Sequence, residues 1–227
     1  MRVVITGTSH GIGLATAAKF MGAGHEVIGI DWDSAPEILM HFSGSCAGHI
    51  GTYTHVMANV SCVSTLPDIP NCDVLINNAG VQIEGLNIPV NLMGVINCCE
   101  KYALQPSIKA VVNVASVSAH NGAEFPLYTA SKGGVLAYTK WLAQEVAKYG
   151  ATANSISPGG VITPMTADIW NDEVKRQMVL DETLLNRWAS SHEIAEWIYF
   201  ICVVNKSMTA QDIIIDNGET ANYNFIQ

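Results

Sequence analysis

Short apolar runs alternate along the chain with segments in which apolar residues recur at helical spacing. Seven runs have the length of β-strands: residues 2–5, 26–30, 53–60, 73–76, 110–115, 152–157 and 213–215. The stretch 74–76 is fully apolar, as expected of a parallel strand buried on both faces. Helical spacing is clearest at 14–20, 90–104 and 127–149. This alternation predicts an α/β fold: about seven parallel strands in one doubly wound sheet, a Rossmann fold with helices on both faces.

The connections between these elements are less regular. Four stretches stand out: a weak helix and loop at 33–52, a short connection at 61–71, a loop at 117–126 and a partly helical stretch at 166–188. Ser190 and Glu193 resemble a capping box that begins one more helix. No change of composition and no internal repeat divides the chain, so residues 1–227 are predicted to form a single domain.

The balance of charged and apolar residues bounds the possible partners. Charged residues make up 14% of the 227 residues, well below the usual quarter, and mean hydropathy is +0.24. A chain so poor in charge is expected to hide surface at subunit contacts, which predicts a homo-oligomer. The net charge of −9 argues against nucleic acid or an anionic membrane as a partner.

Other compositional signals point to a cytoplasmic protein. No apolar run is long enough to span a membrane, and the first strand begins at residue 2, which leaves no room for a signal peptide. The six cysteines form no Cys-x-x-Cys pair, so reduced, buried thiols are expected. The seven histidines lack the spacing of metal ligands, and no metal site is predicted.

A glycine-rich turn follows the first strand. The sequence Thr6-Gly7-Thr8-Ser9-His10-Gly11-Ile12-Gly13 lies between that strand and the helix that follows it. Glycines permit a tight turn and let backbone N–H groups approach a pyrophosphate at the start of the helix. The order strand, glycine turn, helix, strand predicts a βαβ unit that binds a nucleotide.

Asp31 ends the second strand and bears on the choice of cofactor. A carboxylate at this position accepts hydrogen bonds from the adenosine ribose hydroxyls and repels a 2′-phosphate. The turn supplies His10 and the residue after Asp31 is Trp32, so no Arg or Lys is adjacent. NAD is therefore favoured over NADP. The alternative is that Asp31 only begins a turn through Ser34.

Tyr128 and Lys132 are four residues apart, so on a helix they share one face. A tyrosine hydroxyl has a free pKa near ~10, and a neighbouring ammonium lowers it toward neutral pH. Ser116 ends the apolar run at 110–115, where its hydroxyl can meet the same substrate oxygen. We interpret these three residues as a proton-transfer site.

These motifs together resemble the short-chain dehydrogenase/reductase family over nearly the whole chain. The matching pieces stand in family order: the glycine turn, Asn77-Asn78-Ala79-Gly80, Ser116, Tyr128 through Lys132, and Pro158-Gly159. The resemblance implies hydride transfer between NAD and a secondary alcohol or ketone, in a homodimer or homotetramer. Three departures from the family pattern are a short segment between Gly80 and Asn91, Asn59 in place of an aspartate, and the ending Asp216-Asn217-Gly218-Glu219.

The resemblance also implies roles for individual residues. Tyr128, Lys132, Ser116 and Asn91 match the catalytic residues, with Asn91 holding a water that connects Lys132 to solvent. The residues implied in cofactor binding are Gly7, Ser9, His10, Gly11, Ile12, Gly13, Asp31, Trp32, Asn59, Val60, Asn78, Ala79, Gly80, Tyr128, Lys132, Pro158, Gly159, Val161 and Thr163.

Two other functions remain open at this point. One is an NADP-linked reductase of the 3-oxoacyl type, and the other is a catalytically silent NAD-binding sensor. A sensor would typically have lost the tyrosine or the lysine, whereas this chain keeps both. The substrate itself is not readable, because the loops at 82–88, 117–127 and 160–188 that would define it carry no motif.

Overall fold

A computed structural model describes residues 1–36, 51–123 and 125–222 of the chain. Its centre is a seven-stranded sheet in which every neighbouring pair is parallel, in the order β3-β2-β1-β4-β5-β6-β9. The strands are β1 (Arg2–Thr6), β2 (Glu26–Asp31), β3 (Tyr53–Met57), β4 (Val74–Asn77), β5 (Ala110–Val114), β6 (Thr152–Pro158) and β9 (Asp212–Ile215). The predicted doubly wound parallel sheet is therefore confirmed.

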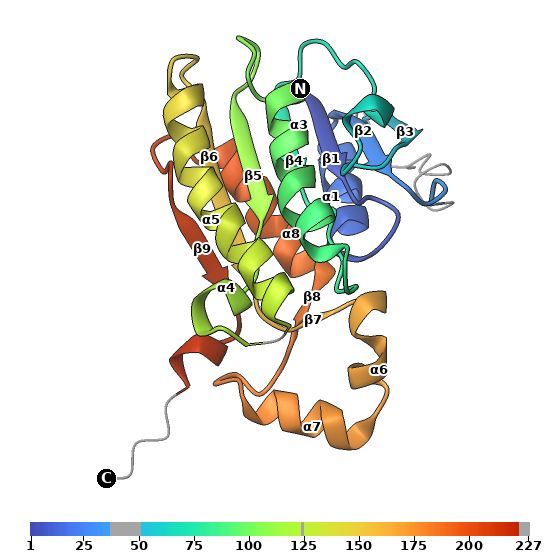
Figure 1. Ribbon diagram of the computed structural model, residues 1–227, viewed down its shortest axis with the longest axis vertical. Helices are drawn as coiled ribbons and strands as arrows, with labels where there is room; N and C mark the ends of the chain where they lie inside the picture. Colours follow the sequence, from blue (N-terminus) through green and yellow to red (C-terminus); the bar gives the residue numbers. More distant parts are fainter. Residues whose placement is uncertain (37–50, 124, 223–227) are drawn as a thin grey trace.

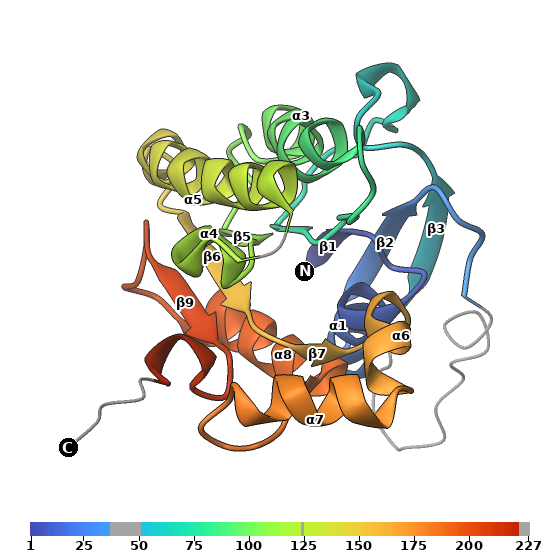
Figure 2. The ribbon, with the colours of Figure 1, turned by 60° about the horizontal axis from the view of Figure 1, so that its bottom comes forward.

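Helices cover both faces of this sheet. Helices α3 (Gly94–Tyr102) and α5 (Pro126–Ala147) lie on one face, and α1 (Gly11–Gly22) and α8 (Ser191–Tyr199) lie on the other (Figure 1). Figure 2 shows the resulting three layers end-on. None of the described helices combines the length and the apolar character that crossing a membrane requires.

Alternate side chains of each strand feed two separate cores. Val4, Leu75 and Val111 belong to the apolar cluster under α3 and α5. Their chain neighbours Val3 and Ile76 point the other way, into the cluster under α1 and α8. Because successive strand residues face opposite sides, strands buried on both faces must be apolar at almost every position. That requirement explains the continuous apolar runs in the sequence.

Several elements differ from the sequence-based expectation. Strand β3 ends at Met57 rather than residue 60, because Asn59 turns the chain and accepts a hydrogen bond from the Ser61 N–H at 3.0 Å. The expected loop at 117–126 contains a short helix, α4 (Ser118–Asn121). The expected helix at 90–104 begins instead as a π-helical turn, η2 (Asn87–Met93), which runs directly into α3.

Other expectations are met. The capping box at the start of α8 is present, with the Ser190 side chain accepting from the Glu193 N–H. The short connection between β3 and β4 holds only a 3-10 turn, η1 (Val63–Thr65). Most of the weak helix and loop expected at 33–52 lies outside the described residues.

The 163–188 segment projects from one end of the sheet. A small parallel pair, β7 (Val161–Ile162) and β8 (Ala189–Ser190), brings the two ends of this segment together. Between them lie η3 (Pro164–Thr166), α6 (Ala167–Trp170) and α7 (Glu173–Asp181). Figure 1 places α6 and α7 beyond the carboxyl ends of the strands, and Figure 2 shows them on the side of α1 and α8. Ligands of open α/β sheets bind outside these strand ends.

Candidate active site

A cavity of about 660 Å³ opens at the carboxyl ends of the strands. Its walls come from the turn after β1, the ends of β2, β4, β5 and β6, the start of α5, the 163–188 segment and the C-terminal turn η5 (Glu219–Ala221). The strand order reverses between β1 and β4, and the connections diverge there. The cavity therefore occupies the topological switch point of the sheet.

The glycine turn forms one wall of this cavity. Gly7 has a φ of +74°, a conformation that favours glycine, and a Cβ there would come within 2.8 Å of Ala79 Cα. A Cβ on Gly13 would overlap the Gly7 carbonyl, so Gly13 lets α1 approach the strand end. No side chain caps α1 and its first turn contains no acid. The first N–H groups of α1 are thus available to an anion.

Asp31 lies at the far end of the same wall. Its carboxylate accepts hydrogen bonds from the backbone N–H groups of Ser9 (2.8 Å) and Asp33 (3.1 Å). These contacts hold the carboxylate beside the glycine turn, where both Asp31 and Trp32 line the cavity. Asp33 lines it as well, so this end of the cavity carries two acids.

Cations are scarce around the cavity. Lys132 is the one Lys or Arg among the described residues that line it. The ranges outside the description, 37–50, 124 and 223–227, contain no Lys or Arg at all. The chain therefore brings no Lys or Arg to the Asp31 end of the cavity.

Ser116, Tyr128 and Lys132 meet at the opposite end. All three are nearly buried, with exposed fractions of 7%, 9% and 4%, and all three line the cavity. Lys132 Nζ donates to the carbonyl of Val114, the last residue of β5, at 2.9 Å and lies 5.7 Å from the centroid of the Tyr128 ring. Strand β5 and helix α5 thereby bring the predicted proton-transfer residues together.

Asn91 lies behind this group rather than on the cavity wall. It is fully buried, and its side-chain amide exchanges two hydrogen bonds with the backbone of Val81, at 2.8 and 2.9 Å. Its Nδ2 also donates to Ser131 Oγ at 3.2 Å. A Cβ added to Gly80 would lie 3.4 Å from both Asn91 Oδ1 and Lys132 Nζ, so the two side chains converge on Gly80.

The structure brings most of the predicted cofactor residues to one cavity. Those that line it are Gly7, His10, Gly11, Ile12, Asp31, Trp32, Asn59, Val60, Asn78, Ala79, Gly80, Tyr128, Lys132, Pro158, Gly159, Val161 and Thr163. Ser9 and Gly13 are not among the lining residues. They lie behind the wall, where Ser9 holds Asp31 and Gly13 packs against Gly7.

Sequence reasoning missed several lining residues of the substrate-side wall. Glu182, Trp188 and Glu219 line the cavity, although no motif marks them. Trp188 is 8% exposed and occupies the space that a side chain on Gly160 would fill. For Glu182 and Trp188 the signal was the aromatic and acidic composition of 160–188, which does not separate a wall from ordinary core, and for Glu219 it was the unusual ending at 216–219.

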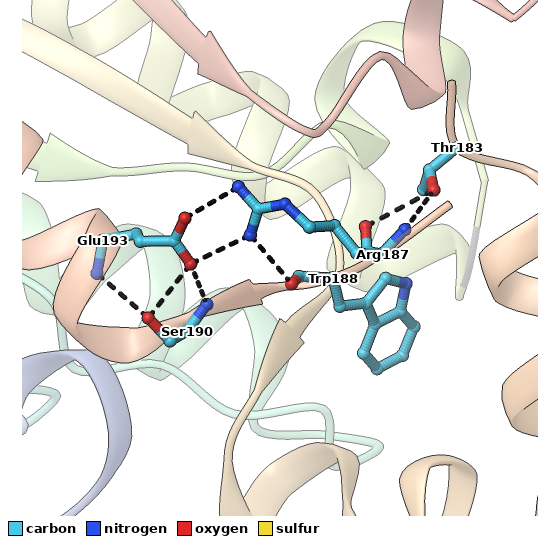
Figure 3. Close-up of polar contacts among 5 residues, drawn as sticks. All are labelled: Thr183, Arg187, Trp188, Ser190 and Glu193. Atoms are coloured by element: carbon cyan, nitrogen blue, oxygen red, sulfur yellow. Dashed lines mark hydrogen bonds and ion pairs between the residues drawn. The ribbon is translucent and has the colours of Figure 1, made fainter. Parts of the chain in front are cut away.

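A network of polar contacts holds Trp188 in place (Figure 3). Both terminal nitrogens of Arg187 donate to the carboxylate of Glu193, at 3.1 and 2.8 Å. The Arg187 N–H donates to Thr183 Oγ1 at 3.1 Å, and Ser190 N–H donates to Glu193 at 2.8 Å. The ion pair with Arg187 holds the pKa of the Glu193 carboxyl at about 2. The ion pair between Arg187 and Glu193 thus links the end of the 163–188 segment to the start of α8.

The described residues contain no group of three or more His, Cys, Asp or Glu placed to hold a metal ion. The described cysteines are free thiols, and all but Cys62 are buried. Burial raises the pKa of Cys72 and of Cys98 to about 12, so these thiols are neutral and unreactive at neutral pH. Cys46 lies outside the described residues.

Comparisons with known proteins agree with this geometry. A family model described as short chain dehydrogenase matches residues 1–174. The chain is 29% identical to the 3-oxoacyl-(acyl-carrier-protein) reductase of Chlamydia pneumoniae, over 96% of each protein. It is 31% identical to the meso-2,3-butanediol dehydrogenase of Serratia marcescens, over 97% of this chain and 94% of the relative.

A solved structure from Agrobacterium tumefaciens has the same fold. It is described as a candidate 2-deoxy-D-gluconate 3-dehydrogenase with bound NADP, and it superposes with a TM-score of 0.84 at 26% identity. The match covers 97% of this chain and 96% of that one.

Proposed function

The chain belongs to the short-chain dehydrogenase family, and on this premise we propose that it is an NAD-dependent alcohol dehydrogenase or ketone reductase with Tyr128 as its general acid and base. The observation that carries the proposal is one cavity with two ends. The glycine turn and Asp31 line one end, and Ser116, Tyr128 and Lys132 line the other. An anion-binding turn and a proton-transfer group on one continuous wall suit the two halves of a redox reaction.

The residues at the Asp31 end fit a dinucleotide. The uncapped start of α1 offers N–H groups to a pyrophosphate, and Asp31 lies next to this turn to receive the ribose hydroxyls. A 2′-phosphate would face Asp31 and Asp33 without a Lys or Arg on the wall to balance its charge. We therefore propose NAD rather than NADP, although one similar structure holds NADP.

NAD, when bound, accepts or returns the hydride, and the protein residues handle the proton and the substrate oxygen. Tyr128 exchanges its hydroxyl proton with that oxygen, while Ser116 donates a hydrogen bond to it. Lys132 is held beside the Tyr128 ring by the Val114 carbonyl, so its positive charge favours the phenolate during proton transfer. These roles of Tyr128, Ser116 and Lys132 follow from their positions at the same end of the cavity.

Asn91 is proposed to support Lys132 indirectly. Its Nδ2 donates to Val81 and Ser131 and its Oδ1 accepts from the Val81 N–H, so the Asn91 side chain holds the backbone beside Gly80, on which Lys132 also converges. The π-helical turn η2 around Asn91 is consistent with such a role, because π-turns commonly occur at functional sites. This assigns Asn91 a positioning role.

The decisive test compares wild type with Tyr128→Phe. Absorbance of the reduced nicotinamide would be followed with a panel of secondary alcohols and ketones. We expect turnover by the wild type, a loss of at least about 10²-fold in the variant, and unchanged NADH affinity. Turnover by Tyr128→Phe at the wild-type rate would disprove the assignment. Binding of NADH without turnover of any substrate would favour the sensor function instead.

The alternative of an NADP-linked 3-oxoacyl reductase has two observations in its favour, the similarity to the 3-oxoacyl reductase of Chlamydia pneumoniae and the NADP bound in one similar structure. Asp31 and the lack of cations on the cavity wall oppose it. Measured affinities for NADH and NADPH separate the two proposals, since tighter binding of NADPH would overturn the argument from Asp31.

A further inference from the structure

We propose that the cavity selects its substrate by charge, so that Glu182 and Glu219 favour an alcohol or ketone carrying an ammonium group or no charge over one carrying a carboxylate. The inference rests on the proposed function, because it concerns the substrate end of the same cavity. Its starting point is that both acids line this cavity, although they are distant in sequence from the proton-transfer residues.

Glu219 borders the end of β6, the strand that pairs with β5, and Ser116 lies just beyond the end of β5. A Cβ on Gly159 would come within 2.7 Å of Glu219 Oε2, so the carboxylate lies directly against this residue. The preceding residue, Pro158, accepts a hydrogen bond from the Val117 N–H at 3.0 Å, and Val117 directly follows Ser116. The carboxylate of Glu219 therefore lies at the end of the strand next to the one that positions Ser116.

Glu182 reaches the cavity from the 163–188 segment. It follows the last residue of α7 and lines the same space as Glu219. The two acids belong to connected segments, because the Leu185 N–H donates to the Asn217 carbonyl at 3.1 Å. A substrate between the 163–188 segment and the strand ends would thus pass both carboxylates.

The nearby cations are placed elsewhere. Arg187 extends toward Glu193 and away from the indole of Trp188, as Figure 3 shows, and pairs with that carboxylate. Arg176 lies over the Trp170 ring, 5.8 Å from its centroid, and does not line the cavity. Of the described Lys and Arg residues, Lys132 alone faces the cavity, and it is engaged at the reacting centre. A substrate carboxylate would therefore be repelled by Glu182 and Glu219, with no Lys or Arg beside these two acids on the described wall to attract it.

Trp188 adds an aromatic surface to the same wall. It lies against Gly160 and stacks on Trp170 with ring centroids 5.8 Å apart, which fixes the indole. An aromatic ring and carboxylates that line the same cavity are a combination that attracts ammonium groups. Each carboxylate is expected to change the preference between a cationic and an anionic substrate by about three- to tenfold, depending on salt.

Three secondary alcohols of nearly equal size test the proposal: 3-hydroxybutyrate, 3-hydroxybutyramide and 4-amino-2-butanol. We expect kcat/KM with NAD to be at least about tenfold higher for the amine than for the carboxylate, and at least about threefold higher for the uncharged amide than for the carboxylate. In a Glu182→Gln/Glu219→Gln double variant the amine-to-carboxylate ratio should fall by about tenfold and the amide-to-carboxylate ratio by about threefold, with the amide as the reference for any general loss. Glu173→Gln, an acid of α7 that does not line the cavity, should leave all three ratios unchanged.

A binding measurement separates this proposal from the proposed function. The same alcohols would be titrated by calorimetry into the NAD complex of Tyr128→Phe, which needs no turnover. If the amine and the amide bind more tightly than the carboxylate but the wild type turns over none of them, the proposed function is wrong and the charge selection of the cavity still holds. Charge selection is wrong if the carboxylate binds as tightly as the amide, if no alcohol binds, or if the double variant leaves the ratios unchanged.

Discussion

The side-chain amide of Asn91 is bonded through both of its polar atoms to the backbone of one residue, Val81. Val81 directly follows Gly80, the residue on which Asn91 and Lys132 converge. The pair therefore joins the π-helical turn η2 to the strand end that faces the reacting group. A disturbance of Asn91 should reach Lys132 through this connection.

We predict that Asn91→Ala slows turnover and leaves NAD binding nearly intact. The change also leaves a buried N–H and a buried carbonyl of Val81 without partners, which should lower the free energy of unfolding by about 2–3 kcal/mol. Urea unfolding, kcat and NAD affinity measure the three effects. Asn205→Ala is the control. The Asn205 side chain accepts hydrogen bonds from the Ser207 and Met208 N–H groups in the loop before β9, so the substitution removes similar bonds away from the cavity. Unchanged turnover in Asn91→Ala would mean that another residue supports Lys132.

Asp31→Ala should change the cofactor preference. Loss of the carboxylate removes the acceptor for the ribose hydroxyls and the repulsion of a 2′-phosphate, so NAD affinity should fall by about tenfold and NADP affinity should rise. Fluorescence titration with NADH and NADPH measures both. Asp33→Ala, two residues further along the turn, should change the cofactor preference less. Asp33 contacts Asp31 through its backbone N–H, which the substitution keeps. An unchanged NADH to NADPH ratio would contradict the assignment.

The Arg187–Glu193 pair should make stability depend on pH in the acid range. Glu193 has a pKa of about 2 in the folded protein against 4.5 as its ordinary value, because of Arg187. Its stabilisation is therefore present above pH 4.5 and is lost as the pH falls toward 2. Because both side chains are about half exposed, the contribution should not exceed about 1 kcal/mol.

Urea unfolding of wild type and Glu193→Gln at several pH values checks this dependence. The difference in unfolding free energy should be largest near neutral pH and should narrow steadily below pH 4.5. A difference that stays constant down to pH 3 or grows with acid would refute the role of this ion pair, because the wild type should be the more acid-sensitive of the two.

Thiol reactivity should follow burial. In a Cys46→Ser background, Cys62 should react with a maleimide at the rate of an exposed thiol, whereas Cys72, Cys98, Cys99 and Cys202 should react only after unfolding. Mass spectrometry of timed samples would count the labels. Rapid labelling of more than one site in the native protein would contradict the packing under α3 and α8.

We expect the protein to be a homodimer or homotetramer that packs through the helices after Asn91 and Tyr128. Trp141 on α5 is 43% exposed and its ring lies 5.2 Å from that of Tyr138, an apolar surface suited to a second copy. Light scattering should give a multiple of 24.3 kDa, and Trp141→Glu should reduce the mass. Trp32→Glu, at a comparable exposure far from α5, should leave the mass unchanged. A monomeric wild type would refute the expectation.

The sequence by itself determined the layout of the fold. Continuous apolar runs of strand length that alternate with helical spacing are typical of parallel strands buried on both faces, so the runs near Val4, Leu75 and Val111 favoured a parallel sheet covered by helices. The glycine turn and the spacing of Tyr128 and Lys132 are local patterns. Local backbone geometry is enough to expose the N–H groups of the turn and to place both side chains on one helix face. Most of the residues that match them accordingly line one cavity, and Ser9 and Gly13 lie behind its wall.

Only the tertiary structure decided which distant residues share that cavity. Glu182, Trp188 and Glu219 reach it because β7 pairs with β8 and because the 163–188 segment bonds to the C-terminal turn. Neither contact can be predicted from the spacing of apolar residues. An acid or a tryptophan in an irregular segment looks the same in the sequence whether it lines a cavity or faces solvent. The bonds of Asn91 to Val81 are a further example, because they join the π-helical turn to a residue ten positions earlier that no local pattern pairs with it.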